Sequence, residues 1–148
     1  MPLGSFVQPR TKNEELGTGF SKRMKITRFE EIEAWQMARS LTDQIYQATR
    51  SGLFSKDYGL KDQTCRAAVS IMGNIAEGFD AGSRAEFARF LGYAQRSCSE
   101  LQSELYVALD QHYVSDKEFT ELHELASKTK SKIGSFIKYL NEARRTKH

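Results

Sequence analysis

The chain has 148 residues, of which 39% are hydrophobic and 28% are charged, and it contains only two prolines. That length is enough for one domain with a hydrophobic core. No apolar run approaches the roughly 20 residues that a membrane span needs, and the N-terminus lacks the charged start and apolar run of a secretory signal. We therefore expect a cytoplasmic protein with no membrane partner.

The formal net charge of +3 is concentrated at the N-terminus. Residues 1–25 hold five basic and two acidic side chains, show no hydrophobic period, and contain Pro, Gly, Ser and Thr. We expect them to form a flexible basic arm. Residues 26–142 are expected to form the folded domain, and residues 143–148 a short basic tail. This distribution is a mild indication of contact with polyanions.

Four helices are predicted between residues 26 and 142. Apolar residues recur at spacings of three and four over roughly 28–50, 59–79, 84–112 and 116–142. Three of these segments start with a hydroxyl residue followed three positions later by glutamate, which is the pattern of a capping box. The pairs are Thr27 with Glu30, Ser83 with Glu86, and Ser115 with Glu118. Because no stretch alternates like a strand and the links are short, we predict an all-α, antiparallel up-down-up-down four-helix bundle.

The helix predicted over 59–79 is apolar on two opposite sides. One side faces the bundle core, and the other carries small and apolar side chains where a surface helix usually carries charges. Self-association would cover that second side, although small apolar residues also tolerate contact with solvent. The residues of this candidate oligomer face are Cys65, Val69, Met72, Gly73 and Ala76.

An amide and a carboxylate, Asn74 and Glu77, lie among apolar residues near the end of the same helix. If this helix packs antiparallel on the next about a turn at 80–83, Asn74 faces Arg89 and Glu77 lies within one turn of it. Arg66 is then level with Ser97 and one turn from Glu100, so an ion pair between Arg66 and Glu100 would fix the register. The predicted structural polar contacts of this hairpin are Arg66, Asn74, Glu77, Ser97 and Glu100.

The sequence offers few residues for catalysis or metal binding. Two cysteines, Cys65 and Cys98, form no CxxC pair, and the three histidines are scattered, so we expect two ordinary thiols, no metal and no cofactor. No nucleophile with a base partner and no phosphate loop is apparent. Three glycines, Gly73, Gly78 and Gly92, suit close helix packing. We therefore expect no enzymatic activity.

Four segments match a family pattern in order and spacing. They are "FEEIEAWQMARSLTDQIY" (29–46), "YGLKDQTCRAAVSIMGNIAEG" (58–78), "EFARFLGYAQRSCSEL" (86–101) and a weaker match in the fourth helix. The specific marks are Trp35, Tyr58-Gly59-Leu60, Gln63, Arg66, the box from Asn74 to Gly78, Phe87, Leu91, Ser97 and Glu100-Leu101. Over about residues 26–140 the sequence resembles the four-helix-bundle proteins encoded in intervening sequences of bacterial 23S ribosomal RNA genes. Their relatives include the accessory variability determinant proteins of diversity-generating retroelements.

The resemblance implies a homo-oligomeric ring, typically a pentamer, without known enzymatic activity. It also implies that nucleic acid and a reverse transcriptase are partners of the retroelement relatives. One departure is Met72-Gly73, where the family often has proline. Because residues 26–148 carry 17 acidic and 17 basic residues, the partners of the basic relatives do not transfer automatically.

Two functions from different classes remain open. The first is a non-enzymatic oligomeric accessory protein that associates with RNA or DNA, or with an RNA-handling enzyme such as a reverse transcriptase. The second is an oligomeric protein scaffold without direct nucleic-acid binding. Candidate phosphate contacts are Arg89, Arg96, Lys128, Lys132, Arg144 and Arg145. The alternative is that these residues only solvate two helix faces, since Glu100, Glu104, Glu121 and Glu124 share them.

Overall fold

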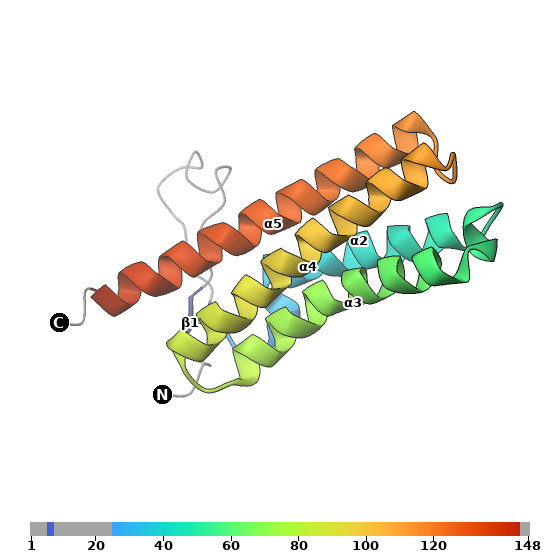
Figure 1. Cartoon of the computed structure of the whole chain (residues 1–148). Coiled ribbons are helices and arrows are strands. Elements are labelled where there is room, and N and C mark those ends of the chain that lie inside the picture. The colour runs from blue at the N-terminus through green and yellow to red at the C-terminus, as the bar shows by residue number, and fades with distance from the viewer. Residues whose placement is uncertain (1–5, 8–24, 146–148) are drawn as a thin grey trace.

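The computed structural model describes residues 6–7 and 25–145, with side chains over 25–142, and its main feature is four long antiparallel helices (Figure 1). The helices are α2 (Glu33–Thr49), α3 (Tyr58–Asp80), α4 (Arg84–Asp110) and α5 (Asp116–Arg145). Two short 3-10 helices, η2 (Phe29–Glu31) and η3 (Phe54–Lys56), precede α2 and α3. The prediction of an all-α four-helix fold is confirmed. Residues 143–145, placed in the basic tail by the sequence, continue α5.

Two short strands pair beside the start of the bundle. Strand β1 (Phe6–Val7) runs antiparallel to β2 (Lys25–Ile26), with Phe6 opposite Ile26. Ile26 is buried. Part of the predicted N-terminal arm therefore forms a two-residue ladder, which the sequence pattern did not indicate, and residues 1–5 and 8–24 lie outside the described residues.

Two of the three predicted helix caps are present. At Ser115 the box is complete: the hydroxyl accepts from the Glu118 amide at 3.1 Å, and the Glu118 carboxylate accepts from the Ser115 amide at 3.2 Å. The Ser83 hydroxyl accepts from the Glu86 amide at 3.2 Å.

The third predicted cap, from Thr27 to Glu30, is wrong. The Thr27 amide and hydroxyl both donate to the carboxylate of Glu31 instead, each over 2.9 Å. The chain enters η2 at this point, and α2 begins only at Glu33, after Ile32, which has no side-chain cap.

The complete box makes Ser115→Ala a direct test of the start of α5. We expect the substitution to lower the free energy of unfolding by about 1 kcal/mol, because the Glu118 amide loses its acceptor. Thermal denaturation measures the change. The matched control is Ser131→Ala at an exposed position inside α5, where alanine is the better helix former and no loss is expected. Equal behaviour of the two variants would contradict the capping role.

The core follows the facing sides of the four helices, as the apolar spacing predicted. Three phenylalanines link α3, α4 and α5: Phe79 contacts Phe87 with ring centroids 6.1 Å apart, and Phe87 contacts Phe136 at 5.2 Å. Helices α3 and α4 pack most extensively, and α2 and α5 least. In the described part of the chain, no helix is long and apolar enough to cross a membrane.

Of the three glycines predicted to mark close packing, only Gly78 does so. A Cβ atom there would lie 2.8 Å from the Cβ of Phe90 and 3.0 Å from Cδ1 of Phe87. At Gly73 and Gly92 an added Cβ would meet nothing within 4 Å. The two helices therefore approach closely at Gly78, near the turn between them (Figure 1).

The register of α3 against α4 is fixed by a hydrogen bond from the Ser97 hydroxyl to the Ser70 hydroxyl, 2.9 Å long. The sequence placed Ser97 one helical turn away, beside Arg66. That prediction matched Cα positions, whereas helical side chains lean toward the N-terminus of their own helix. In antiparallel helices the two leans are opposite, so the α3 residue that meets Ser97 lies nearer the turn than the Cα count suggests.

Candidate functional site

The polar residues between α3 and α4 form a local hydrogen-bond chain. The Asn74 amide nitrogen donates to the backbone oxygen of Ser70 at 2.8 Å and to its hydroxyl at 3.0 Å. The same hydroxyl accepts from Ser97. The predicted approach of Asn74 to Arg89 is wrong, since Arg89 binds Glu86 on its own helix at 2.7 Å. Asn74 and Ser97 are therefore structural contacts of the hairpin, with partners that the sequence did not identify.

The predicted ion pair between Arg66 and Glu100 is also wrong. Arg66 projects from the exposed side of α3 and pairs with Asp62 at 3.0 Å, one turn earlier in the same helix. Glu100 is exposed on α4, and Glu77 is exposed on α3. Among the described residues Glu77 forms no ion pair, so within one chain it does not close the hairpin.

A buried carboxylate, Glu104, lies on the side of α4 that carries Ser97. Its residue is 8% exposed, and its Oε2 atom has no hydrogen-bond partner among the described residues. Burial raises its pKa to about 7, and the charge of Glu100 and a hydrogen bond with that side chain act in the same direction. The expectation that Glu104 lies on a solvated helix face is therefore wrong. Its spacing of seven from Ser97 and fourteen from Phe90 was the available signal.

The two cysteines differ in depth. Burial raises the pKa of the Cys98 thiol to about 12, so little of it is thiolate at neutral pH. Cys65 is buried against α2, with its sulfur 3.5 Å from the Thr49 hydroxyl. Over the described ranges, no group of three or more His, Cys, Asp or Glu side chains could hold a metal ion.

The outward side of α3 is open along most of the candidate oligomer face. Val69 is 44% exposed, and Met72, Gly73 and Ala76 are half-buried. Cys65 is buried beside α2 and lines an open cavity between the two helices, not the outward side of α3. We call Val69, Met72, Gly73 and Ala76 the α3 face.

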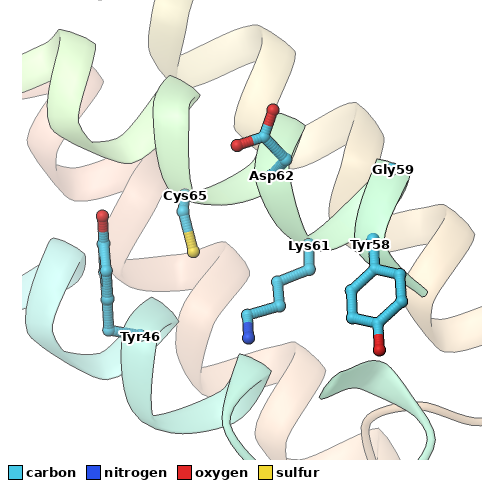
Figure 2. Close-up of a pocket in the computed structure, with 6 residues that line it drawn as sticks. All are labelled: Tyr46, Tyr58, Gly59, Lys61, Asp62 and Cys65. Carbon is cyan, nitrogen blue, oxygen red and sulfur yellow. The ribbon is translucent and has the colours of Figure 1, made fainter. Parts of the chain in front are cut away.

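An open cavity of about 620 Å³ continues this surface toward α2. Figure 2 shows Tyr46 of α2 on one side of it and Tyr58 of α3 on the other, with the Lys61 side chain between them. Tyr58 is 78% exposed and Tyr46 40%. These tyrosines were not among the residues predicted for a binding surface, although an aromatic residue on the polar side of a helix is a signal for one.

The candidate phosphate contacts are not all available. Lys132 forms an ion pair with Glu33 that joins α5 to α2, and both side chains are largely buried, which removes Lys132 from a free cationic surface. The Arg89 guanidinium lies 5.9 Å from the centre of the Tyr93 ring, and that of Arg96 lies 5.8 Å from it. Lys128 is exposed on α5. The side chains of Arg144 and Arg145 lie outside the described residues.

Comparison with known proteins agrees with the four-helix fold. The family model for the 23S rRNA-intervening sequence protein matches residues 30–135. A crystal structure of a protein with unknown function from the S23 ribosomal protein family of Bacteroides thetaiotaomicron is similar, with a TM-score of 0.65 and 21% sequence identity. The match covers 71% of this chain and 98% of that chain, and at this identity it shows the fold. No curated protein matches the chain significantly. From the match of the family model, the chain belongs to the 23S rRNA-intervening sequence protein family.

Proposed function

We propose that this chain is a non-enzymatic cytoplasmic accessory protein that assembles into a ring-shaped homopentamer and associates with nucleic acid. The observation that carries the nucleic-acid part is the uneven charge of α5. Residues 116–127 hold four acids and one base, whereas residues 128–145 hold six bases and one acid. Each copy therefore presents one basic half-helix to which phosphate groups can bind.

Among the basic side chains that the structure describes in this half-helix, the exposed ones are Lys128 and Lys138. Both side chains project into solvent, and two small residues, Ser131 and Ser135, lie exposed between them. Small side chains leave room for a bulky backbone such as that of RNA. We call Lys128, Ser131, Ser135 and Lys138 the α5 basic face.

Assembly is supported by Gly73. A glycine inside a helix costs about 1 kcal/mol relative to alanine, and none of the described residues requires one at this position, because an added Cβ would meet none of their atoms within 4 Å. A second copy that packs closely on the α3 face would require it. In a ring, each modest α5 basic face is repeated, which strengthens binding to one long polyanion.

Charge reversal on α5 tests the nucleic-acid part. With a structured 23S rRNA fragment, we expect Lys128→Glu to weaken binding at least about tenfold at low salt and to reduce the salt slope by about 1. The matched control is Lys117→Glu, which makes the same charge change at an exposed site in the acidic half of α5. Equal affinities of the two variants, or no binding by the wild type at low salt, would contradict the proposal.

A protein scaffold is the second candidate function. It is favoured by the two exposed tyrosines, Tyr46 and Tyr58, at the open cavity between α2 and α3, since tyrosine is enriched at protein interfaces. In that case the partner is a protein and no nucleic acid is bound directly; an RNA-handling enzyme, such as a reverse transcriptase, belongs to the first candidate function. An assembled protein that does not bind RNA at any salt concentration would support the scaffold function.

A further inference from the structure

A ring needs two different contact faces on every copy. A face that pairs with its own duplicate closes a two-fold dimer, whereas a head-to-tail contact between different faces generates a ring. The large hydrophobic residues exposed on the described chain fall into two groups. One group, Tyr46, Leu53, Tyr58 and Val69, lies on the α2–α3 side, and the other, Tyr93, Tyr106 and Val107, lies on α4.

We infer that the α3 face of each copy packs against the outer side of α4 in the next copy, with Tyr93 seated at Gly73. This inference rests on the ring assembly proposed above. We call Arg89, Tyr93, Arg96 and Val107 the α4 face. The contact would occupy Arg89 and Arg96, which would leave the α5 basic face for nucleic acid.

The relative direction of the two faces suits a small ring. Neighbouring helices of a four-helix bundle present their outer sides about 90° apart around the bundle axis. In a closed ring the two contact directions of each copy meet at about 90° for four copies and about 108° for five. Faces on adjacent helices therefore match small rings, whereas faces on opposite helices would produce an open fibre.

The heights of the two faces along the bundle also agree. Copies related by an axis parallel to the helices contact one another at equal height. The bond between Ser70 and Ser97 fixes that height, so Tyr93, four residues before Ser97, lies level with Asn74, four residues after Ser70. The close approach of Gly78 to Phe90 confirms the same register near the turn. Tyr93 is therefore at the height of Gly73 in the neighbouring copy.

The exposed ring of Tyr93 and the contacts that restrict its motion favour this residue as the inserted side chain. Its residue is 36% exposed, and its ring contacts Phe90 edge-on with the centroids 5.8 Å apart. The two arginines that lie against the ring restrict it further. A ring that is ordered before binding loses little entropy on insertion, and at Gly73 the missing side chain leaves the space for it.

The charges around the two faces are complementary. Glu77 and Asp80 are exposed on α3 near the turn; on α4, Arg89 lies at the height of Glu77, and Arg96 lies about two turns farther from the turn. Arg96 forms no ion pair with a carboxylate in the described part of the chain, and Arg89 has only the exposed pair with Glu86. Opposite charges at the rim steer the α3 face toward α4, and like charges oppose pairing of two α3 faces.

Two variants, each altered on one face, test the contact in the full chain. Gly73→Lys fills the space on the α3 face and places a cation opposite Arg96. Because lysine is a better helix former than glycine and the position is open, a loss of assembly would not result from unfolding. The α4-face variant combines Tyr93→Ala with Arg96→Glu. The control, Thr120→Lys, adds the same charge at an exposed position of α5 outside the α3 face, the α4 face and the α5 basic face.

Light scattering should give the wild-type oligomer for the control and the mass of one chain for each face variant, with helical content unchanged by circular dichroism. An equimolar mixture of the two face variants should form a one-to-one dimer, since each retains one intact face. Full assembly of the α4-face variant, or a mixture that stays monomeric, would overturn the inference while leaving the proposed assembly in place. A monomeric wild type would overturn both.

Discussion

Replacing Gly78 by alanine should destabilise the bundle by about 2 kcal/mol, because the new methyl group has no space between α3 and α4. The added Cβ would lie 2.8 Å from the Cβ of Phe90 and 3.3 Å from the backbone oxygen of Phe87. Neither atom is the flexible end of a side chain, so the helices themselves must separate. The gain in helix propensity offsets only about 1 kcal/mol of the overpacking cost.

Thermal denaturation should show this loss as a decrease in Tm of about 4–8 °C. The control is Gly92→Ala, also inside a helix, where an added Cβ meets nothing within 4 Å. That variant should be as stable as the wild type or slightly more so. If both variants were stabilised alike, the close approach at Gly78 would not exist in solution.

Substituting Glu104 by glutamine should remove a pH-dependent part of the stability. Burial of the Glu104 carboxyl raises its pKa from 4.5 to about 7, and Glu100 contributes through its charge and a hydrogen bond. The folded protein then binds a proton more tightly than the unfolded chain. This contribution is fully present below pH 4.5 and is lost as the pH rises toward and through about 7.

The size of the effect follows from the shift. This rise in the pKa of Glu104 corresponds to a loss of about 3 kcal/mol in the free energy of unfolding between low pH, where the carboxyl is protonated in both states, and high pH, where it is ionised in both. In the wild type, Tm should therefore fall between pH 5 and pH 8. In Glu104→Gln, whose neutral amide does not titrate, we expect that part of the fall to disappear.

The matched control is Glu124→Gln at an exposed position of α5, which should retain the wild-type profile. Glu100→Gln provides a second check, because removal of the neighbouring charge should bring the pKa of Glu104 down and weaken the pH dependence. Parallel profiles for the wild type and Glu104→Gln would show that the carboxyl is not buried in solution.

The sequence predicted the helices well and the contacts between them poorly. Apolar spacing located all four helices because burial of one stripe depends on period alone. Capping at Ser115 was predictable because both partners are local. The pair of Arg66 with Asp62 shows the limit: a charge can find a partner one turn away on its own helix, and the hydrophobic period says nothing about which partner it takes.

In the candidate site, too, features of a single helix could be predicted from the sequence and contacts between helices could not. The openness of the α3 face could be predicted, because it depends on which side of one helix is apolar. The burial of Glu104 and the pairing of Lys132 with Glu33 could not, because both depend on the rotation of one helix against another. A small error in that rotation moves a side chain from solvent into the interface between helices.

The uneven packing of the four helices has a consequence for motion. Of the four contacts between neighbouring helices, the one between α2 and α5 is the least extensive and the one between α3 and α4 is the most extensive. Local opening costs least where few apolar contacts are lost. We therefore expect the bundle to open most readily between α2 and α5, and the ion pair between Lys132 and Glu33 bridges that boundary.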